Sequence, residues 1–203
     1  MIDMTSVKFS RTLTWVGLGF GAGVMGLTVY LWVKPLHFEV TNPWTSPPRV
    51  HVCDTSPASV ERVKRAMAFV EDNCGVFSEV VETGPCIFTD NGIPSGFNDS
   101  TYYGKAFIDL RGYGFNESHA GLTTVHFSES TGRMLWTLTQ IPEDRVSDDS
   151  MVLEHELIHV LGIDRQRDHT SRNGHILNYT TIDGGWNTSG ICDSLTPVYG
   201  AMR

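Results

Sequence analysis

The segment from Asp149 to Gly162 reads DSMVLEHELIHVLG. Its apolar residues recur at helical spacing, Asp149 places a negative charge at the positive end of a helix, and Gly162 is a typical helix stop. We therefore expect a helix from about Asp149 to Leu161. On a helical wheel its apolar face, opposite two histidines, is formed by Leu153, Leu157, Val160 and Leu161.

The histidine face of this helix has the spacing of a metal site. His155 and His159 are four residues apart, so both side chains project from the same side of the helix and can hold one metal ion. Glu156, beside the first histidine, can polarise a metal-bound water. The pattern therefore predicts a site for one metal ion at His155 and His159, with Glu156 placed to act on a metal-bound water.

The longer run HELIHVLGIDRQRDH, which begins at His155, resembles the metzincin zinc peptidases and looks most like the matrixins. Their pattern is HExxHxxGxxH, followed by a turn that contains methionine. The resemblance covers about residues 49–203 in element order, but only residues 155–179 at motif level. The residues that match in place are His155, Glu156, His159 and Gly162.

The third zinc ligand of this pattern is displaced. The matrixin spacing expects it at Arg165, and the next histidine, His169, comes four residues later. From His169 to Leu177 the spacing is again the one that matrixins show between the third ligand and the turn methionine. The resemblance thus implies a four-residue insertion, with His169 as the third ligand and Leu177 in the turn. Alternative third ligands are Asp164, Asp183 and His175.

The resemblance also implies a zinc-dependent endopeptidase mechanism. Glu156 takes a proton from the zinc-bound water as that water attacks a peptide carbonyl. Tyr179, just past the turn, would support the oxyanion or line the S1′ pocket, and a packed aromatic is an equal alternative. The protein or peptide substrate would lie extended along an edge strand, for which Leu122–Phe127 and Met134–Ile141 are the two candidates.

From Arg49 onward the chain is expected to form an α+β domain with a twisted mixed sheet, two main helices and an irregular C-terminal subdomain. Ser56 and Pro57 open the first helix, and Gly75 stops it. A last turn is expected near Ser194–Tyr199. The expected strands are Arg49–Cys53, Val76–Glu82, Lys105–Leu110, Leu122–Phe127 and Met134–Ile141.

Residues 12–33 carry no charge and are expected to form a single transmembrane helix of the signal-anchor type. As a helix they would extend over about 33 Å. Lys8 and Arg11 outweigh Lys34, so residues 1–11 are expected in the cytoplasm and the catalytic domain, residues 49–203, outside it. Residues 34–48 are proline-rich and predict a stiff stalk. Glycines four residues apart in the span favour weak helix–helix self-association.

All four cysteines follow the expected span, which predicts two disulfides in an oxidising compartment. If the first helix joins the first two strands, those strands are parallel neighbours. This arrangement places Cys53 near Cys86 and leaves Cys74 for Cys192. Candidate glycosylation sites in the same part of the chain are Asn98, Asn116, Asn178 and Asn187.

The composition excludes two classes of protein. Hydrophobic residues make up 40% of the 203 residues and charged residues 19%, which excludes a chain that is disordered throughout. The net charge is −8 and there is no run of lysine and arginine, so no nucleic-acid partner is expected. Two alternatives to a peptidase stay open: a hydrolase of peptidoglycan or another amide on the same zinc centre, and a catalytically inactive binding module.

Overall fold

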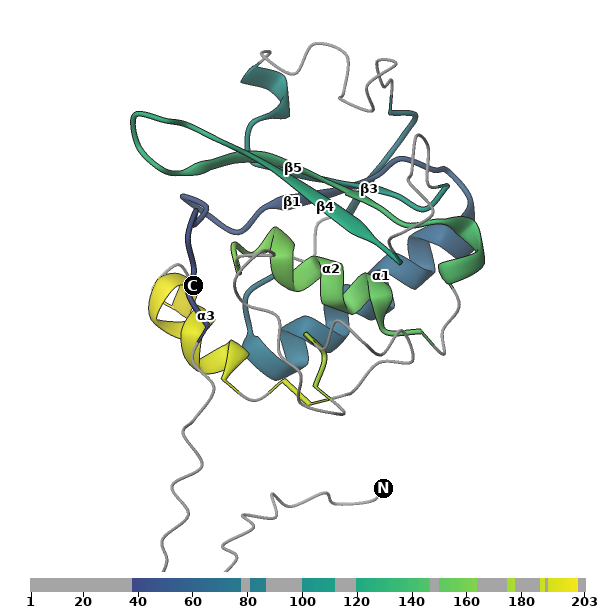
Figure 1. The fold of residues 1–203 in the computed structure, drawn as a ribbon. Helices are drawn as coiled ribbons and strands as arrows, with labels where there is room; N and C mark the ends of the chain where they lie inside the picture. Colours follow the sequence, from purple (N-terminus) through teal and green to yellow (C-terminus); the bar gives the residue numbers. More distant parts are fainter. Residues whose placement is uncertain are drawn as a thin grey trace, which may run out of the picture. The chain divides into compact units, whose positions relative to one another are not determined.

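A computed structural model describes residues 38–77, 81–86, 100–111, 120–146, 150–163, 175–177, 187–188 and 190–200. By its internal contacts the chain divides into Met1–Val33 and Lys34–Arg203. The described residues all belong to the second unit. Within them, a five-stranded sheet carries helices on one face, so this unit has an α+β fold (Figure 1).

The sheet has the strand order β2-β1-β3-β5-β4. β2, β1, β3 and β5 run parallel to their neighbours, whereas β4 is antiparallel to β5 and forms one edge. β5 lies between β3 and β4 and is therefore an interior strand. The strands are β1 (Arg49–Val52), β2 (Val81–Thr83), β3 (Lys105–Asp109), β4 (Leu122–Phe127) and β5 (Met134–Gln140).

Three α-helices are present in the described ranges: α1 (Pro57–Cys74), α2 (Val152–Val160) and α3 (Ile191–Tyr199). The Asp54 carboxylate accepts hydrogen bonds from the Ser56 amide and the Ser59 hydroxyl, which organises the start of α1. Gly75 ends α1 with a left-handed backbone, φ 64°, that a glycine adopts without strain. Two short 3-10 helices, η1 (Ser100–Tyr102) and η2 (Glu143–Arg145), lie in the connections.

The main core lies between the sheet and the helices. Val63, Met67 and Val70 of α1 are buried there, as the apolar stripe of this helix predicts. α2 is buried along nearly its whole length, because it packs against α1 and lies under β4 and β5 (Figure 1). A smaller cluster on the opposite face of the sheet contains Cys53, Phe107, Trp136 and Leu138.

Residues 38–48, which the sequence predicts as part of a stalk, pack into the domain instead. Phe38 and Trp44 are buried in the main core. Val40 forms a β-bridge with Ile163, and the amide of Thr41 donates to the carbonyl oxygen of Gly162, 2.9 Å away. Its two large apolar side chains attach this segment to the core.

The expected fold class needs two corrections. The C-terminal part is not wholly irregular, because Ile191–Tyr199 forms a third helix. In the part of the chain that the structure describes, no helix is long and apolar enough to cross a membrane. The longest one, α1, carries charged side chains along its length. A fold class that includes a transmembrane helix is therefore wrong for the described ranges, and residues 12–33 lie outside them.

The predicted disulfides are confirmed, with the predicted pairing. Cys53 bonds to Cys86, and Cys74 bonds to Cys192. The first bond follows from the parallel pairing of β1 with β2, because the residue after β1 then lies beside the residues that follow β2. The second joins the end of α1 to α3, 118 residues later. No cysteine is left free.

Candidate metal centre

The N-terminal end of α2 is held by a buried ion pair. Both guanidinium Nη atoms of Arg62, on α1, bind the Glu154 carboxylate at 2.7 and 2.8 Å. The same guanidinium group donates to the carbonyl oxygens of Ser150 and Val146. Both charged side chains are almost completely buried, so each needs the other as a partner. This arrangement fixes α2 against α1 at Glu154, the residue directly before His155.

The C-terminal end of α2 is held by two aromatic side chains. Trp44 Nε1 donates to the carbonyl oxygen of Val160, 2.7 Å away, and the Tyr199 hydroxyl donates to that of Leu161, 2.8 Å away. These carbonyls have no partner within the helix, as at any helix end. Burial raises the pKa of Tyr199 to about 12, so its hydroxyl keeps the proton that it donates. Gly162 then turns the chain with φ 92°.

The two histidines of α2 face each other. The Nε2 atoms of His155 and His159 lie 3.1 Å apart. The Nδ1 atom of His155 lies 2.7 Å from the carbonyl oxygen of Ile176, and that of His159 lies 2.9 Å from the carbonyl oxygen of Ile163. A carbonyl can only accept a hydrogen bond, so in both rings Nδ1 carries the proton. In a neutral ring, Nε2 then presents its lone pair.

This arrangement fits a bound metal ion. Two imidazole lone pairs that face each other at 3.1 Å repel unless a cation lies between them. Nitrogen ligands of a tetrahedral zinc ion, each about 2.0–2.1 Å from the metal, are separated by about 3.3 Å. Backbone carbonyls on the outer ring nitrogens are also the usual support of metal-bound histidines. His155 and His159 therefore have the chemistry and the spacing of zinc ligands.

The protonation state of His155 is also suitable for binding a metal ion. Burial lowers the pKa of His155 below its ordinary value, and the nearby His175 lowers it further, against the opposing effect of the hydrogen bond to Ile176. The ring is therefore neutral at neutral pH. Neutral imidazole is the form that binds a metal ion.

Glu156 lies beside the histidines but points toward the sheet. Its side chain is buried, and one carboxylate oxygen, Oε2, accepts a hydrogen bond of 2.7 Å from the hydroxyl of Thr123 on β4. The predicted catalytic residue is thus placed between the histidine face of α2 and the edge strand of the sheet. Sequence reasoning did not identify Thr123, because its role depends on where β4 crosses α2.

The turn predicted at Leu177 lies next to the histidine pair. Its residue Ile176 supplies the carbonyl that binds His155, and Leu177 is fully buried. The ring nitrogen Nδ1 of His175 accepts the amide proton of Leu177, and the ring lies 5.4 Å from that of Phe38. His175, an alternative third ligand, thus forms part of this turn, where its Nδ1 accepts a backbone hydrogen bond. The amide of Ile176 donates to Asn187, which fixes the turn from the other side.

The third ligand lies beyond what the structure describes. His169, Asp164, Asp183 and Tyr179 all fall outside the described ranges. Among the residues within those ranges, no group of three or more histidine, cysteine, aspartate or glutamate side chains gathers around one point. The structure therefore brings together His155, His159 and Glu156, and leaves the identity of the third ligand as a prediction.

Of the candidate glycosylation sites, Asn187 is exposed, whereas Asn98, Asn116 and Asn178 lie outside the described ranges. His126 stacks on the Trp136 ring, with the two ring centroids 5.1 Å apart. It lies on β4, whose side chains alternate between the two faces of the sheet.

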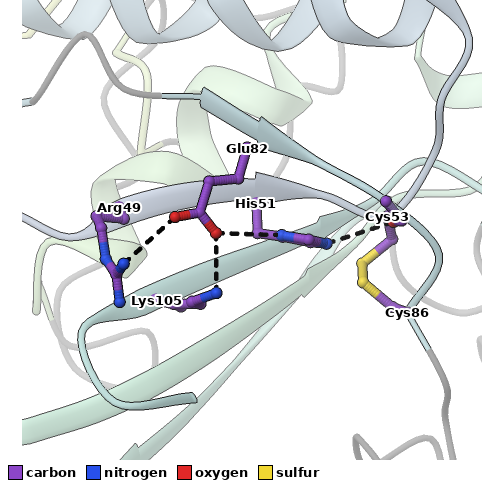
Figure 2. Close-up of polar contacts among 7 residues, drawn as sticks. Arg49, His51, Cys53, Glu82, Cys86 and Lys105 are labelled. Atoms are coloured by element: carbon purple, nitrogen blue, oxygen red, sulfur yellow. Dashed lines mark hydrogen bonds and ion pairs between the residues drawn. A yellow bond between two sulfur atoms is a disulfide. The ribbon is translucent and has the colours of Figure 1, made fainter. Parts of the chain in front are cut away.

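A charged cluster lies on the face of the sheet opposite the helices (Figure 2). Glu82 of β2 binds Lys105 at 2.8 Å and Arg49 at 3.3 Å, and His51 approaches it to 3.6 Å. The other nitrogen of His51, Nε2, lies 3.3 Å from the carbonyl oxygen of Gly84. The cluster joins β1, β2 and β3 near the Cys53–Cys86 disulfide. Its ion pairs link these three strands on the face of the sheet away from α2.

No protein-family model matches this chain, and no curated protein matches it.

Proposed function

We propose that the protein is a zinc-dependent endopeptidase that resembles the metzincins, and among them the matrixins. One observation carries the proposal: the imidazole rings of His155 and His159 present facing Nε2 atoms at 3.1 Å, each with its Nδ1 held by a backbone carbonyl. The HExxHxxG pattern and the buried Glu156 beside the pair support it.

His155 and His159 would hold one zinc ion, with His169 as the proposed third ligand and Asp164 as its alternative. Zinc bound there would polarise the peptide carbonyl and lower the pKa of a bound water. The protein supplies neutral imidazoles in fixed orientations, because Ile163 and Ile176 accept their Nδ1 protons.

Glu156 is the general base of the proposed reaction. Its carboxylate accepts a proton from the attacking water, whose oxygen forms a bond to the peptide carbonyl carbon. When the carbon–nitrogen bond breaks, Glu156 returns that proton to the leaving amine. Because the carboxylate is bound to Thr123 at one oxygen, its orientation does not depend on the substrate.

The sheet provides a place for an extended peptide. The sequence left two candidate strands, and the strand order favours Leu122–Phe127, because β4 is the edge and β5 is interior. An edge strand presents backbone amide and carbonyl groups to which a peptide can add as a further strand. β4 also packs on α2, so a peptide bound along it would lie beside the histidine face of that helix.

We further propose that the domain works in an oxidising, extracytoplasmic compartment. Both pairs of cysteines form disulfides, and all four cysteines take part. Such bonds persist in secreted and cell-surface proteins and are rare in the cytosol. Free-thiol measurement by mass spectrometry on protein from its native compartment tests this, and four free thiols would contradict it.

The function is tested with the full-length protein and an unstructured protein substrate such as casein. We expect hydrolysis that a zinc chelator abolishes and that added zinc restores. Cleavage of peptidoglycan or small amides, without cleavage of casein, would contradict an endopeptidase. It would favour a hydrolase that acts on those substrates with the same zinc centre. Bound zinc without hydrolysis of any of these substrates would contradict an enzyme and favour the binding module.

A further inference from the structure

The Glu156 carboxylate lies in a small cradle that β4 builds around it. The Thr123 hydroxyl lies 2.7 Å from Glu156 Oε2 and 3.2 Å from the backbone carbonyl oxygen of the same residue. A hydroxyl has one proton, and the shorter, charge-assisted bond to the carboxylate is the stronger one. Thr123 therefore donates to the side chain of Glu156.

A second threonine orients the first. Thr139 of β5 is paired directly with Thr123 in the sheet, and the two hydroxyl oxygens are 2.9 Å apart. Since the proton of Thr123 goes to Glu156, the proton of Thr139 goes to Thr123. Both side chains are fully buried, so water does not compete for these bonds. The result is a chain of two hydroxyl groups that ends on the carboxylate.

Gly121, just before β4, forms the other wall of the cradle. A Cβ atom at this position would lie 2.8 Å from both Cγ and Oε1 of Glu156 and 2.8 Å from Cγ1 of Val152. Real Cβ atoms do not approach so closely, so any side chain here would displace the glutamate. The backbone directly before β4 thus lies against one side of Glu156, while Thr123 on β4 binds the other carboxylate oxygen.

We propose that Thr123 is a positioning residue for the general base, oriented by Thr139 and accommodated by Gly121. The inference rests on the proposed function of Glu156. It adds that β4, the edge strand proposed to bind the substrate, also sets the position of Glu156. The substrate and the general base would then be positioned by the same strand. Reactive geometry is sensitive at this scale, since a displacement of about 1 Å can reduce a rate by about 100-fold.

The test compares three variants of the full-length, zinc-loaded protein. Thr123→Val removes the hydroxyl at nearly constant volume, and Thr123→Ser retains it. Thr137→Val is the matched control, because its hydroxyl is also buried on the helix side of β5 but has no hydrogen-bond partner in the described structure. We expect Thr123→Val to lower kcat by about 10- to 100-fold with KM and zinc content unchanged. Thr123→Ser and Thr137→Val should keep kcat within about threefold of the wild type.

Two further variants separate positioning from a general loss of structure. Gly121→Ala should lower kcat as Thr123→Val does, with zinc retained. Adding Thr123→Val to Glu156→Gln should not reduce the residual rate further, because the base is already absent.

The outcomes distinguish this inference from the function on which it rests. An active wild type in which Thr123→Val keeps its kcat overturns the inference alone. Equal losses in Thr123→Val, Thr123→Ser and Thr137→Val would also overturn it, because the effect would then be structural. A wild type that binds zinc and hydrolyses nothing overturns the proposed function, and the inference with it.

Discussion

The histidine pair depends on two backbone carbonyls that no residue pattern reveals. Ile163 lies just after α2, and Ile176 lies in a turn far along the chain, yet their oxygens bind the Nδ1 atoms of the two rings. These two hydrogen bonds fix the tautomer of each ring and orient both Nε2 atoms toward the same point. At the scale of single residues, the proposed site is therefore a property of the turn at His175–Leu177 as much as of α2 itself.

The first residue-scale prediction concerns the third ligand. We expect His169→Ala to lose most of the bound zinc, because two imidazoles alone hold zinc weakly. His175→Ala should keep the metal, since the ring accepts a hydrogen bond within its own turn. Zinc per chain after dialysis is the measurement. Loss of zinc in Asp164→Ala, with retention in His169→Ala, would contradict the four-residue insertion.

The second residue-scale prediction concerns Glu156. We expect Glu156→Gln to retain zinc and to lose about 100- to 10,000-fold in kcat, because an amide cannot accept the proton of the attacking water. The Thr123 hydroxyl can still donate to the amide oxygen, so the fold should be preserved. Full activity in this variant, measured on casein, would show that Glu156 is structural.

Among the elements, α2 is the one that the rest of the domain holds in place. α1 binds its start through the buried Arg62–Glu154 pair, while Trp44 and Tyr199 bind its last carbonyls. Each of these groups comes from a different part of the chain. The two histidines thus stand on a helix that is held at both ends by other parts of the domain.

The buried Arg62–Glu154 ion pair gives a prediction about how α1 and α2 are held together. We expect Arg62→Met to lower the free energy of unfolding by about 3–5 kcal/mol, because the buried Glu154 carboxylate then has no countercharge. The double variant Arg62→Met/Glu154→Leu should lose less than either single change, since no buried charge remains. Denaturant unfolding measures all three. Additive losses would mean that the two groups act independently.

The second prediction for the secondary-structure elements concerns the charged cluster around Glu82, which joins β1, β2 and β3. The hydrogen bond from Lys105 holds the pKa of Glu82 below its ordinary value of 4.5, and the charge of Arg49 acts in the same direction, whereas burial opposes them. A lowered pKa in the folded state means that the stabilisation is present above pH 4.5 and is lost as the pH falls through the folded value.

We therefore expect the free energy of unfolding to decline on acidification below about pH 5, and to decline less steeply in Glu82→Gln. Lys105→Met should flatten the curve in the same way, because it removes the main cause of the shift. The effect should be modest and weaker at high salt, because the carboxylate is partly exposed. Identical slopes in the wild type and both variants would contradict this account of the cluster.

For the whole molecule, the disulfides and the first described segment hold the domain together over long sequence distances. Cys74–Cys192 closes a separation of 118 residues, and Cys53–Cys86 one of 33 residues. Residues 38–48 add contacts from the other end of the domain, through the burial of Phe38 and Trp44. Together these links join α3 and the N-terminal segment to the core around α2.

The whole-molecule prediction follows from the lengths of the two closed loops. Replacing Cys74 and Cys192 by serine should lower the free energy of unfolding by about 2–5 kcal/mol. The loss should exceed that for the Cys53/Cys86 pair by about 1 kcal/mol, because a longer loop restricts the unfolded chain more. Denaturant unfolding of both double variants is the measurement, and a larger loss for the shorter loop would contradict the loop-length argument.

Much of the fold was predictable from local sequence. Most strand boundaries agree to within one residue, because apolar alternation and turn residues act locally: Leu122–Phe127 is the same in prediction and structure. The disulfide pairing also followed from topology. The packing of residues 38–48 did not, since Phe38 and Trp44 stand among prolines without any periodicity. Their burial depends on α2 and α3, which lie more than a hundred residues later.

The site was predictable only where its residues share one helix. The spacing of His155, Glu156 and His159 places them together without any knowledge of the fold. Thr123 is 33 residues from Glu156, and its role depends on the register of β4 against β5 and on the crossing of β4 over α2. Such contacts are set by tertiary packing, which a local pattern does not record.

We propose that His155 and His159 bind one metal ion through their Nε2 atoms. The most direct test is zinc-edge X-ray absorption on the full-length protein after dialysis against limited zinc. We predict one zinc per chain, with nitrogen ligands at about 2.0–2.1 Å and the outer-shell signal of at least two imidazoles. His155→Ala and His159→Ala should each lose that signal. A protein that retains no zinc, or a spectrum unchanged in both variants, would contradict the claim.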